Sequence, residues 1–244
     1  PQKPLRDLAG KPLVVRVLER VQTMKIGAAI VVATDSDAVA DAVRAVGGVA
    51  VLTRPDHPSG TDRVAEVASL AAYRTHDVIV NVQGDEPFVT EDAVRVAAGF
   101  VERGEFPIGT VACPDDASIL VEPSVVKVVA DRTNRALYFS RASIPFLRDP
   151  ADAGVRASLV LRHIGIYAYS RPALERWVSL PPSPLEIIER LEQLRPLADG
   201  LAIGVGITAM ASGGIDTEDD LRRANATWPN PVHSSPSPPA VGTY

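Results

Sequence analysis

The chain has 244 residues, enough to bury the core of one large α/β domain, and 46% of its residues are hydrophobic. Its net charge of -5, with scattered lysines and arginines, excludes the basic surface that a nucleic-acid binder needs. No apolar run reaches the ~20 residues that span a bilayer, so we expect no membrane insertion. The single cysteine, Cys113, excludes an internal disulfide and is typical of a reducing compartment. We therefore expect a buried, inert thiol in a cytoplasmic protein.

Helix and strand patterns alternate along the first half of the chain. A loop over 2–10 precedes a helix that starts near Pro12, because apolar residues from Leu13 to Val21 recur at helical spacing. The next elements are strands over 28–33, 49–53 and 78–82 and from Ile108, and helices over 34–46, 61–73 and 91–103, the last capped by Thr90. This alternation predicts βαβ units and hence parallel strands.

The second half departs from this order. Its expected elements are strands over 125–130, 136–140 and 161–169, a helix over 183–198, a strand over 202–208 and a short helix opened by Thr217. A polar turn joins the first two strands, which is typical of an antiparallel hairpin. Ser183, Pro184 and Glu186 form a strong signal for a helix start. The whole pattern predicts a mostly parallel mixed sheet with helices on both faces and an antiparallel hairpin added.

The chain ends in a segment of different composition. From Trp228 it reads WPNPVHSSPSPPAVGTY, which is rich in proline and serine and has no hydrophobic period. Such segments cannot bury enough apolar surface to offset their ordering entropy, so we expect residues 228–244 to be disordered. Residues 1–227 then form one domain.

An acidic turn follows the apolar strand at Val78. The segment reads VIVNVQGDEPF, and its β-branched start is typical of a strand buried on both faces. Ligands of α/β proteins collect beyond the carboxyl ends of strands, which places Asp85 at a favourable position. Magnesium is commonly held by one or two carboxylates together with substrate phosphates. Asp85 is therefore a candidate metal ligand, although Gly-Asp and Glu-Pro also form ordinary turns.

A second polar loop, TRPDHPSGTDR over 53–63, lies between a strand and a helix start. Backbone N–H groups at a helix N-terminus and guanidinium groups both bind phosphate or carboxylate oxygens. The loop is thus a candidate anion site, and the alternative is a capped polar loop.

Taken together, six segments resemble the 3-deoxy-D-manno-octulosonate (Kdo) cytidylyltransferases, or CMP-Kdo synthetases. They are TRPDHPSGTDR, VIVNVQGDEP, ALYFSRASIP, RHIGIYAYS, SPLEIIERLEQLR and GIDTEDDL, in family order over residues 1–226. The resemblance implies a Rossmann-like nucleotidyltransferase fold and a homodimer. It also implies transfer of CMP from CTP to Kdo, with release of pyrophosphate, for lipopolysaccharide assembly.

The resemblance also implies roles for individual residues. It places Asp85 and Asp216 at Mg²⁺ and Lys3 at the phosphates, and these three form the predicted catalytic set. Glu86 is expected only to hold the turn, and Thr217 already provides the helix cap that is the alternative role for Asp216. The predicted cytidine site comprises Arg54, Ser59, Gly60 and Gln83. The predicted sugar-acid site comprises Arg63, Arg141, His163, Tyr167, Glu192 and Gln193.

The residue types of the sugar-acid set suit their ligand. A carboxylate calls for an arginine fork, and Glu192 and Gln193 can hydrogen-bond sugar hydroxyls. Helical spacing predicts that Glu189 shares one face with them, and the alternative is a solvated face. We expect His163 to bind substrate rather than to act as a general base, because phosphoryl transfer depends mostly on alignment and charge neutralisation.

The chain departs from the family pattern at its start. The family has a strand and a loop of the type P-A-R-x-x-S-x-R-L-P-x-K-P-L, of which Pro1 to Leu5 matches only the end. We therefore expect that an N-terminal strand and most of the phosphate loop are missing, which would leave the polypeptide as written poorly active or insoluble. Two further alternatives stay open: another CMP-sugar-acid synthetase, of sialate or 8-amino-Kdo type, and a nucleotide-binding remnant without catalysis.

Overall fold

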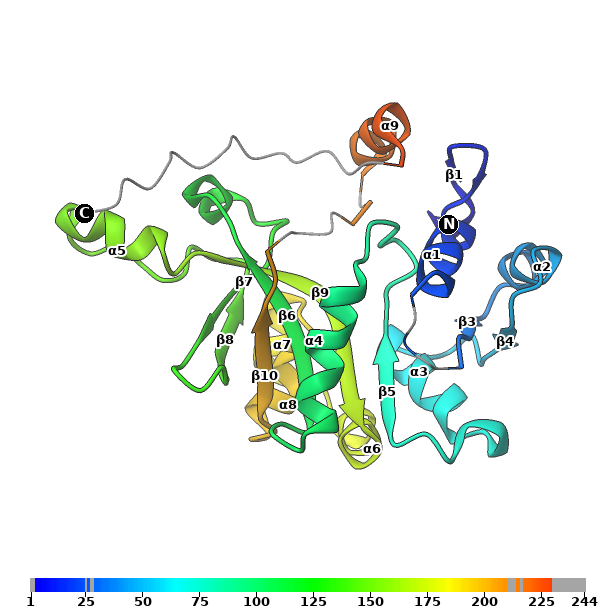
Figure 1. The fold of residues 1–244 in the computed structure, drawn as a ribbon. Coiled ribbons are helices and arrows are strands. Elements are labelled where there is room, and N and C mark those ends of the chain that lie inside the picture. The colour runs from blue at the N-terminus through cyan, green and yellow to red at the C-terminus, as the bar shows by residue number, and fades with distance from the viewer. Residues whose placement is uncertain (1–2, 25, 27–28, 210–213, 216, 230–244) are drawn as a thin grey trace.

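A six-stranded mixed sheet forms the centre of the molecule (Figure 1). The computed structural model describes residues 3–24, 26, 29–209, 214–215 and 217–229. The strands of the large sheet are β5 (Val78–Asn81), β6 (Ile108–Pro114), β7 (Lys127–Ala130), β8 (Ala136–Ser140), β9 (Leu161–Ser170) and β10 (Ile203–Ile207). Their order is β10-β6-β9-β7-β8, and β5 pairs with the C-terminal part of β9.

Two small sheets accompany the large one. The first is an antiparallel hairpin of β1 (Asp7–Leu8) and β2 (Lys11–Pro12), and the second is a parallel pair of β3 (Val32–Thr34) and β4 (Ala50–Leu52). The hairpin occupies a region that we expected to be a loop. Its tight turn is made by Ala9 and Gly10, whose φ angles of 52° and 81° suit a two-residue hairpin.

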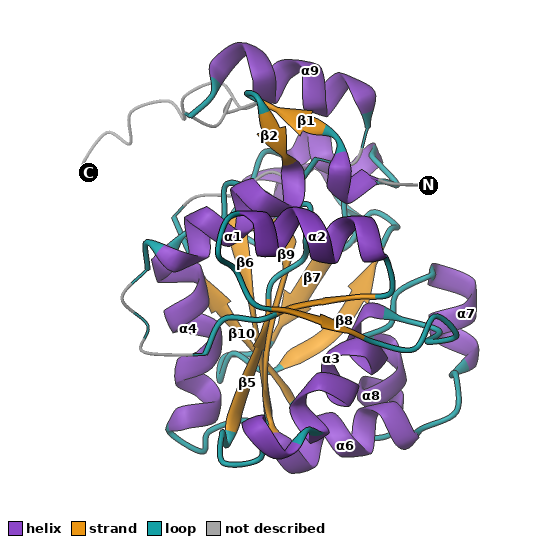
Figure 2. Ribbon diagram, turned by 90° about the vertical axis from the view of Figure 1, so that its right-hand side faces the viewer, coloured by secondary structure: helices purple, strands orange, loops and turns teal. Residues whose placement is uncertain are grey.

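Helices cover both faces of the large sheet, as the sequence predicts (Figure 2). They are α1 (Leu13–Gln22), α2 (Asp37–Ala45), α3 (Gly60–Ser69), α4 (Glu91–Glu102), α5 (Ala153–Ala157), α6 (Arg171–Ser179), α7 (Pro184–Glu189), α8 (Leu194–Ala198) and α9 (Glu218–Thr227). Along β9 the side chains alternate: Ile164 and Ile166 face α4, while Tyr167 and Tyr169 pack with Trp177 of α6. This alternation follows from the period-two geometry of a strand.

The sheet is less parallel than the sequence predicts. β10 and β6 are parallel, but β9 lies between β5 and β6 and is antiparallel to both. Within the described residues β5 is paired along one edge, so Val78, Ile79 and Val80 are partly exposed rather than fully buried. The predicted hairpin is confirmed as the antiparallel pair β7–β8.

Several element boundaries differ from the predictions. β3 begins at Val32 rather than at residue 28, and α3 ends at Ser69 because Leu70 is extended before a 3₁₀ turn over Ala71–Tyr73. Helix α6 was not predicted, although Pro172 near its start was a usable signal. Part of the expected 228–244 tail, residues 230–244, lies outside the described residues.

The predicted capping signals are confirmed. Thr90 accepts the backbone N–H of Ala93, and the start of α7 carries a full capping box between Ser183 and Glu186. Cys113 is 1% exposed, and burial raises the pKa of its thiol to about 11, as expected for an inert core cysteine. No helix in the described part of the chain combines the length and apolar character required to cross a bilayer.

Candidate active site

Asp85 lies in the turn that follows β5, and its carboxylate contacts Lys3. The Lys3 Nζ to Asp85 Oδ2 distance is 2.5 Å, and the Asp85 side chain keeps 30% of its surface exposed. Lys3 belongs to a 3₁₀ turn over Lys3–Leu5, which is 82 positions from Asp85 in the sequence. The fold thus brings together two residues of the predicted catalytic set.

The C-terminal segment meets the same turn. The backbone N–H of Ile215 donates to the carbonyl oxygen of Asp85 at 2.9 Å. Gly214 lies so close to Glu86 that a Cβ atom there would be 2.9 Å from Glu86 Oε1, which favours glycine at this position. Asp216 itself lies outside the described residues, so its metal role stays a prediction, although the residue before it is bonded to Asp85.

The predicted cytidine residues gather at the start of α3. Ser59 caps this helix by accepting the N–H of Asp62, and its hydroxyl donates to Asp62 Oδ2 at 2.6 Å. Gln83 lies beside the helix start, because a Cβ atom on Gly60 would be 3.9 Å from its Oε1. A Cβ atom on Gly165 of β9 would be 3.7 Å from Gln83 Cγ, so the Gln83 side chain lies near two residues without side chains.

The two arginines of the polar loop contact acidic residues, Asp56 and Asp35. Arg54 is 67% exposed, and its guanidinium lies 3.5 Å from Asp56. Arg63 is held more tightly, with Nη2 3.0 Å from Asp35 Oδ2 and Nη1 bonded to Thr53 Oγ1. Among the described residues, the side chain of neither arginine makes a hydrogen bond or ion pair with another member of the cytidine or sugar-acid sets.

Four of the predicted sugar-acid residues lie on or beside β9 and the segment that follows α7. His163 Nε2 is 3.0 Å from Thr110 Oγ1, and its ring centroid is 5.0 Å from that of Phe139 and 5.4 Å from that of Tyr167. Burial lowers the pKa of His163 to about 3. A neutral imidazole at this position suits hydrogen bonding to a substrate better than proton abstraction.

Tyr167 and Glu192 both carry polar groups in a buried setting. The Tyr167 hydroxyl has no hydrogen-bond partner among the described residues, and burial raises its pKa well above the usual value. Glu192 Oε2 accepts a hydrogen bond from Thr61 Oγ1 at 3.1 Å, and burial raises the pKa of Glu192. Gln193 is only 6% exposed, which excludes the alternative of a solvated face at this position.

The single long helix that we predicted over 183–198 is wrong. Arg190 adopts left-handed geometry, with φ 56° and ψ 46°, and ends α7 before α8 begins at Leu194. Glu189 and Glu192 therefore do not share a helix face. Glu189 contacts Ser140 and Arg141, whereas Glu192 contacts Thr61 on the nucleotide side.

Sequence reasoning missed three polar residues beside the site: Thr61, Thr110 and Lys127. Thr110 and Lys127 are completely buried. Lys127 carried a readable signal, since it stands between two pairs of valines in a strand pattern and a lysine there must be buried and satisfied. Thr61 and Thr110 carried none, because a threonine at a helix start or in a strand is ordinary.

Comparison with known proteins supports the resemblance. A family model described as cytidylyltransferase matches residues 1–203. A 3-deoxy-manno-octulosonate cytidylyltransferase from Gemmatimonas aurantiaca is 58% identical over 228 residues, which cover 93% of this chain and 88% of the relative. A protein of the same name from Leptothrix cholodnii is 47% identical over 91% of this chain and 84% of its own length.

Solved structures also support the resemblance to this family. A CMP:2-keto-3-deoxy-manno-octonic acid synthetase complexed with CTP aligns with a TM-score of 0.82 and 39% identity over 92% of this chain and 90% of the other. A 4-diphosphocytidyl-2C-methyl-D-erythritol synthase from Anaerococcus prevotii is only 13% identical, with a TM-score of 0.60 over 91% of each chain, and shows the fold alone. The chain belongs to the cytidylyltransferase family, among the 3-deoxy-manno-octulosonate cytidylyltransferases.

Proposed function

We propose that this protein transfers CMP from CTP to Kdo and releases pyrophosphate, for lipopolysaccharide biosynthesis. The observation that carries the proposal is the hydrogen bond between Thr61, at the start of α3, and Glu192, in the predicted sugar-acid set. This bond joins the segment assigned to the nucleotide to the segment assigned to the sugar. The names of the relatives at 58% and 47% identity support the choice of substrates.

The reaction is an in-line displacement at the α-phosphorus of CTP. The anomeric oxygen of Kdo forms a bond to this phosphorus as the bond to the β-phosphate oxygen breaks, and the hydroxyl proton passes to water. In this proposal Lys3, which lies beside Asp85, neutralises phosphate charge, and the N-terminus of α3 offers backbone N–H groups and a positive dipole end. His163 and Tyr167 orient the sugar acid as neutral hydrogen-bonding groups.

The donor set suits Mg²⁺. Asp85 offers a partly exposed carboxylate at a strand end, and its present partner is a lysine, a cation that a metal ion can replace. One or two carboxylates with substrate phosphates are the usual ligands of Mg²⁺. In this proposal Asp85 and Asp216 would hold the ion, which would supply charge neutralisation for the leaving pyrophosphate.

The activity is tested by incubating the protein with CTP, Mg²⁺ and Kdo and measuring pyrophosphate. Parallel reactions with sialate and 8-amino-Kdo identify the preferred sugar acid. Turnover that is faster with either of these would overturn the choice of Kdo. Calorimetric binding of CTP without turnover of any of the three acids would instead support the nucleotide-binding remnant.

Replacing Asp85 by Asn tests the metal role. The change keeps the shape of the side chain and removes the charge, so we expect turnover to fall by about 10²-fold or more. Thermal unfolding should change little, because Asp85 is partly exposed. D219N serves as the control, since Asp219 is an exposed acid in the first turn of α9. An equal loss of activity and thermal stability in D85N would mean that the residue is structural.

We also propose that the protein is a cytoplasmic homodimer. The buried single cysteine fits a reducing compartment. Around α5, which projects from one end of the sheet in Figure 1, exposed apolar side chains include Phe146 at 82% and Val155 at 66%. Apolar patches of this kind are typical of subunit contacts.

The test of this surface is the variant F146D, which should be a monomer by light scattering. The control is I188D on α7, because Ile188 is also highly exposed, and this variant should remain a dimer. A dimer of F146D would exclude this surface as the subunit contact.

A further inference from the structure

Arg141 is held by the protein at four of its polar atoms. Its Nε donates to the carbonyl oxygen of Glu189 at 2.9 Å, and its Nη1 donates to the carbonyl oxygen of Pro123 at 2.9 Å. Its backbone N–H donates to Glu189 Oε2 at 2.9 Å, and its carbonyl oxygen accepts from Lys127 Nζ at 2.5 Å. Among the described residues, Nη2 of Arg141 makes no hydrogen bond, so its two N–H groups are the part of the guanidinium that can bind a ligand.

Glu189 makes two of these four contacts and is itself fixed. The hydroxyl of Ser140 donates to Glu189 Oε1 at 2.6 Å, so both carboxylate oxygens have a partner. The break of the helix at Arg190 is what turns this side chain toward β8 rather than along a continuous helix. A carboxylate with both oxygens bonded defines the position of the groups around it more closely than a solvated one does.

A second cation, Lys127, lies beside Arg141. Lys127 is 0% exposed and its ammonium group is bonded to three carbonyl oxygens, those of Glu122, Val125 and Arg141. Burial and the neighbouring Arg141 lower the pKa of Lys127, while Glu189 and Glu122 act in the opposite sense. Because both carboxylate oxygens of Glu189 already have partners, an anionic ligand is a suitable acceptor for the N–H groups at Nη2.

We infer that Glu189 is a positioning residue that presents Nη2 of Arg141 to the carboxylate of the sugar acid. The inference rests on the proposed function, because it needs Arg141 to bind that carboxylate. Glu189 does not touch the substrate in this arrangement. It acts through Arg141 by fixing both the backbone N–H and the side-chain Nε, and Lys127 fixes the carbonyl oxygen of the same residue.

The test is E189Q, assayed by pyrophosphate release with Kdo and CTP varied separately. Loss of a charged hydrogen bond should raise KM for Kdo by about tenfold or more. We expect kcat to stay within about threefold, and KM for CTP to stay unchanged, because Arg141 belongs to the predicted sugar-acid site and not to the predicted cytidine site. E175Q is the matched control, because Glu175 is an exposed glutamate on α6. An unchanged KM for Kdo, or an equal rise in both KM values, would overturn the inference.

Two further variants separate positioning from folding. S140A removes the hydroxyl that fixes Glu189 Oε1 and should raise KM for Kdo in the same direction by a smaller factor, even if E189Q folds poorly. The double variant E189Q/R141K should have the KM of R141K alone, because Glu189 acts through Arg141, and additive effects would contradict this. Absence of turnover by the unmodified protein with Kdo would refute the proposed function, whereas normal wild-type turnover with an unaffected E189Q refutes only this inference.

Discussion

At the scale of single residues, His163 shows how burial determines chemistry. Its ring lies against Phe139 and Tyr167, and Nε2 faces the hydroxyl of Thr110. These neighbours offer no negative charge to stabilise an imidazolium, so burial alone lowers the pKa of His163 from 6.5 to about 3. The imidazole is therefore neutral near pH 7.

This pKa predicts a specific dependence of stability on pH. Between about 6.5 and about 3, His163 binds a proton in the unfolded chain but not in the folded protein. The free energy of unfolding should therefore fall as pH is lowered, by up to ~1.4 kcal/mol per pH unit from this residue. Urea unfolding of wild type and H163Q at about pH 7 and about pH 5 measures the effect. H163Q should lose part of the slope, and identical slopes would show that folding does not lower the pKa of His163.

At the scale of elements, the break between α7 and α8 shapes the sugar-acid side of the site. Because of this break, Glu189 contacts Arg141 while Glu192 contacts Thr61. On one straight helix the two side chains would lie on the same face. The turn depends on Arg190, a residue with a Cβ atom in a left-handed conformation. Such a conformation costs a non-glycine residue roughly 1 kcal/mol, so the packing around it must compensate.

Replacing Arg190 by glycine should therefore stabilise the protein. Glycine adopts left-handed geometry without strain, although it also raises the entropy of the unfolded chain, and we expect a net gain of roughly 0.5–1 kcal/mol. The control is R222G, which introduces glycine inside the regular helix α9 and should cost about 1 kcal/mol. Chemical denaturation of both variants gives the comparison. A loss of stability in R190G would mean that the arginine side chain makes a contact that outweighs the strain.

At the scale of the whole molecule, the two ends of the described chain pack on each other. In Figures 1 and 2 the β1–β2 hairpin and α9 lie side by side at the top of the molecule. Asn225 of α9 accepts the N–H of Ala9 at 2.8 Å, and Arg6 pairs with Glu218 at 2.6 Å. This contact holds the segment that carries Lys3 close to the turn that carries Asp85.

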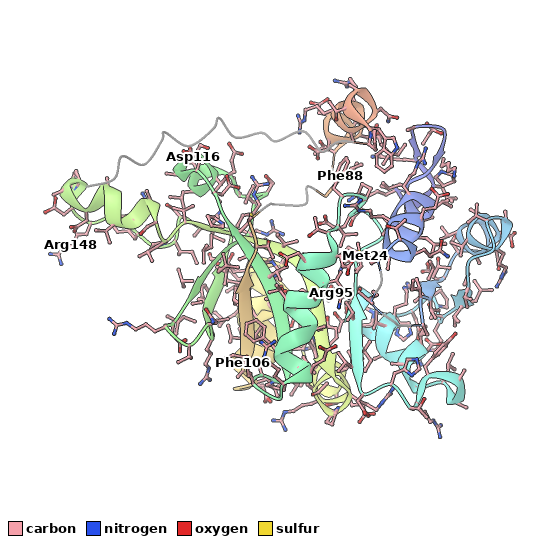
Figure 3. All side chains as sticks on the ribbon, viewed as in Figure 1. Met24, Phe88, Arg95, Phe106, Asp116 and Arg148 are labelled. Carbon is pink, nitrogen blue, oxygen red and sulfur yellow. The ribbon has the colours of Figure 1, made fainter. Side chains whose placement is uncertain are left out.

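Trp228 also packs at this end of the molecule, against Phe88 and Arg16. Its ring centroid is 5.7 Å from that of Phe88, which is labelled beneath α9 in Figure 3, and 5.0 Å from the guanidinium carbon of Arg16. Burial of an aromatic ring and a cation–π contact are each worth on the order of 1 kcal/mol at a partly exposed site. The tryptophan thus couples the C-terminal segment, the helix α1 and the end of the Asp85 turn.

We expect W228A to loosen this end of the molecule and leave the large sheet intact. Hydrogen exchange should speed up over the hairpin and α9, with a loss of roughly 2 kcal/mol or less in local opening free energy. The other tryptophan, Trp177, is 1% exposed in the main core, and W177A should reduce protection throughout the large sheet. Uniform loss of protection in W228A would contradict a separate role for this contact.

The sequence alone was sufficient for the elements whose signals are local. Thr90, Ser183 and Thr217 mark helix starts because a side chain caps backbone N–H groups within the next three residues. The hairpin β7–β8 follows from two apolar runs around a polar turn. Family motifs in their order identified the cytidylyltransferase, and with it the candidate residues around Asp85 and His163.

Only the tertiary structure decided how those residues meet. The position of β9 between β5 and β6, the contact of Lys3 with Asp85, and the separate partners of Glu189 and Glu192 all join residues far apart in the chain. Local propensity favoured a continuous helix through Arg190, but long-range contacts on both sides of the break outweigh a strain of about 1 kcal/mol. Capping and periodicity act over a few residues and are readable in sequence, whereas strand order and ion pairing depend on which distant surfaces are buried together.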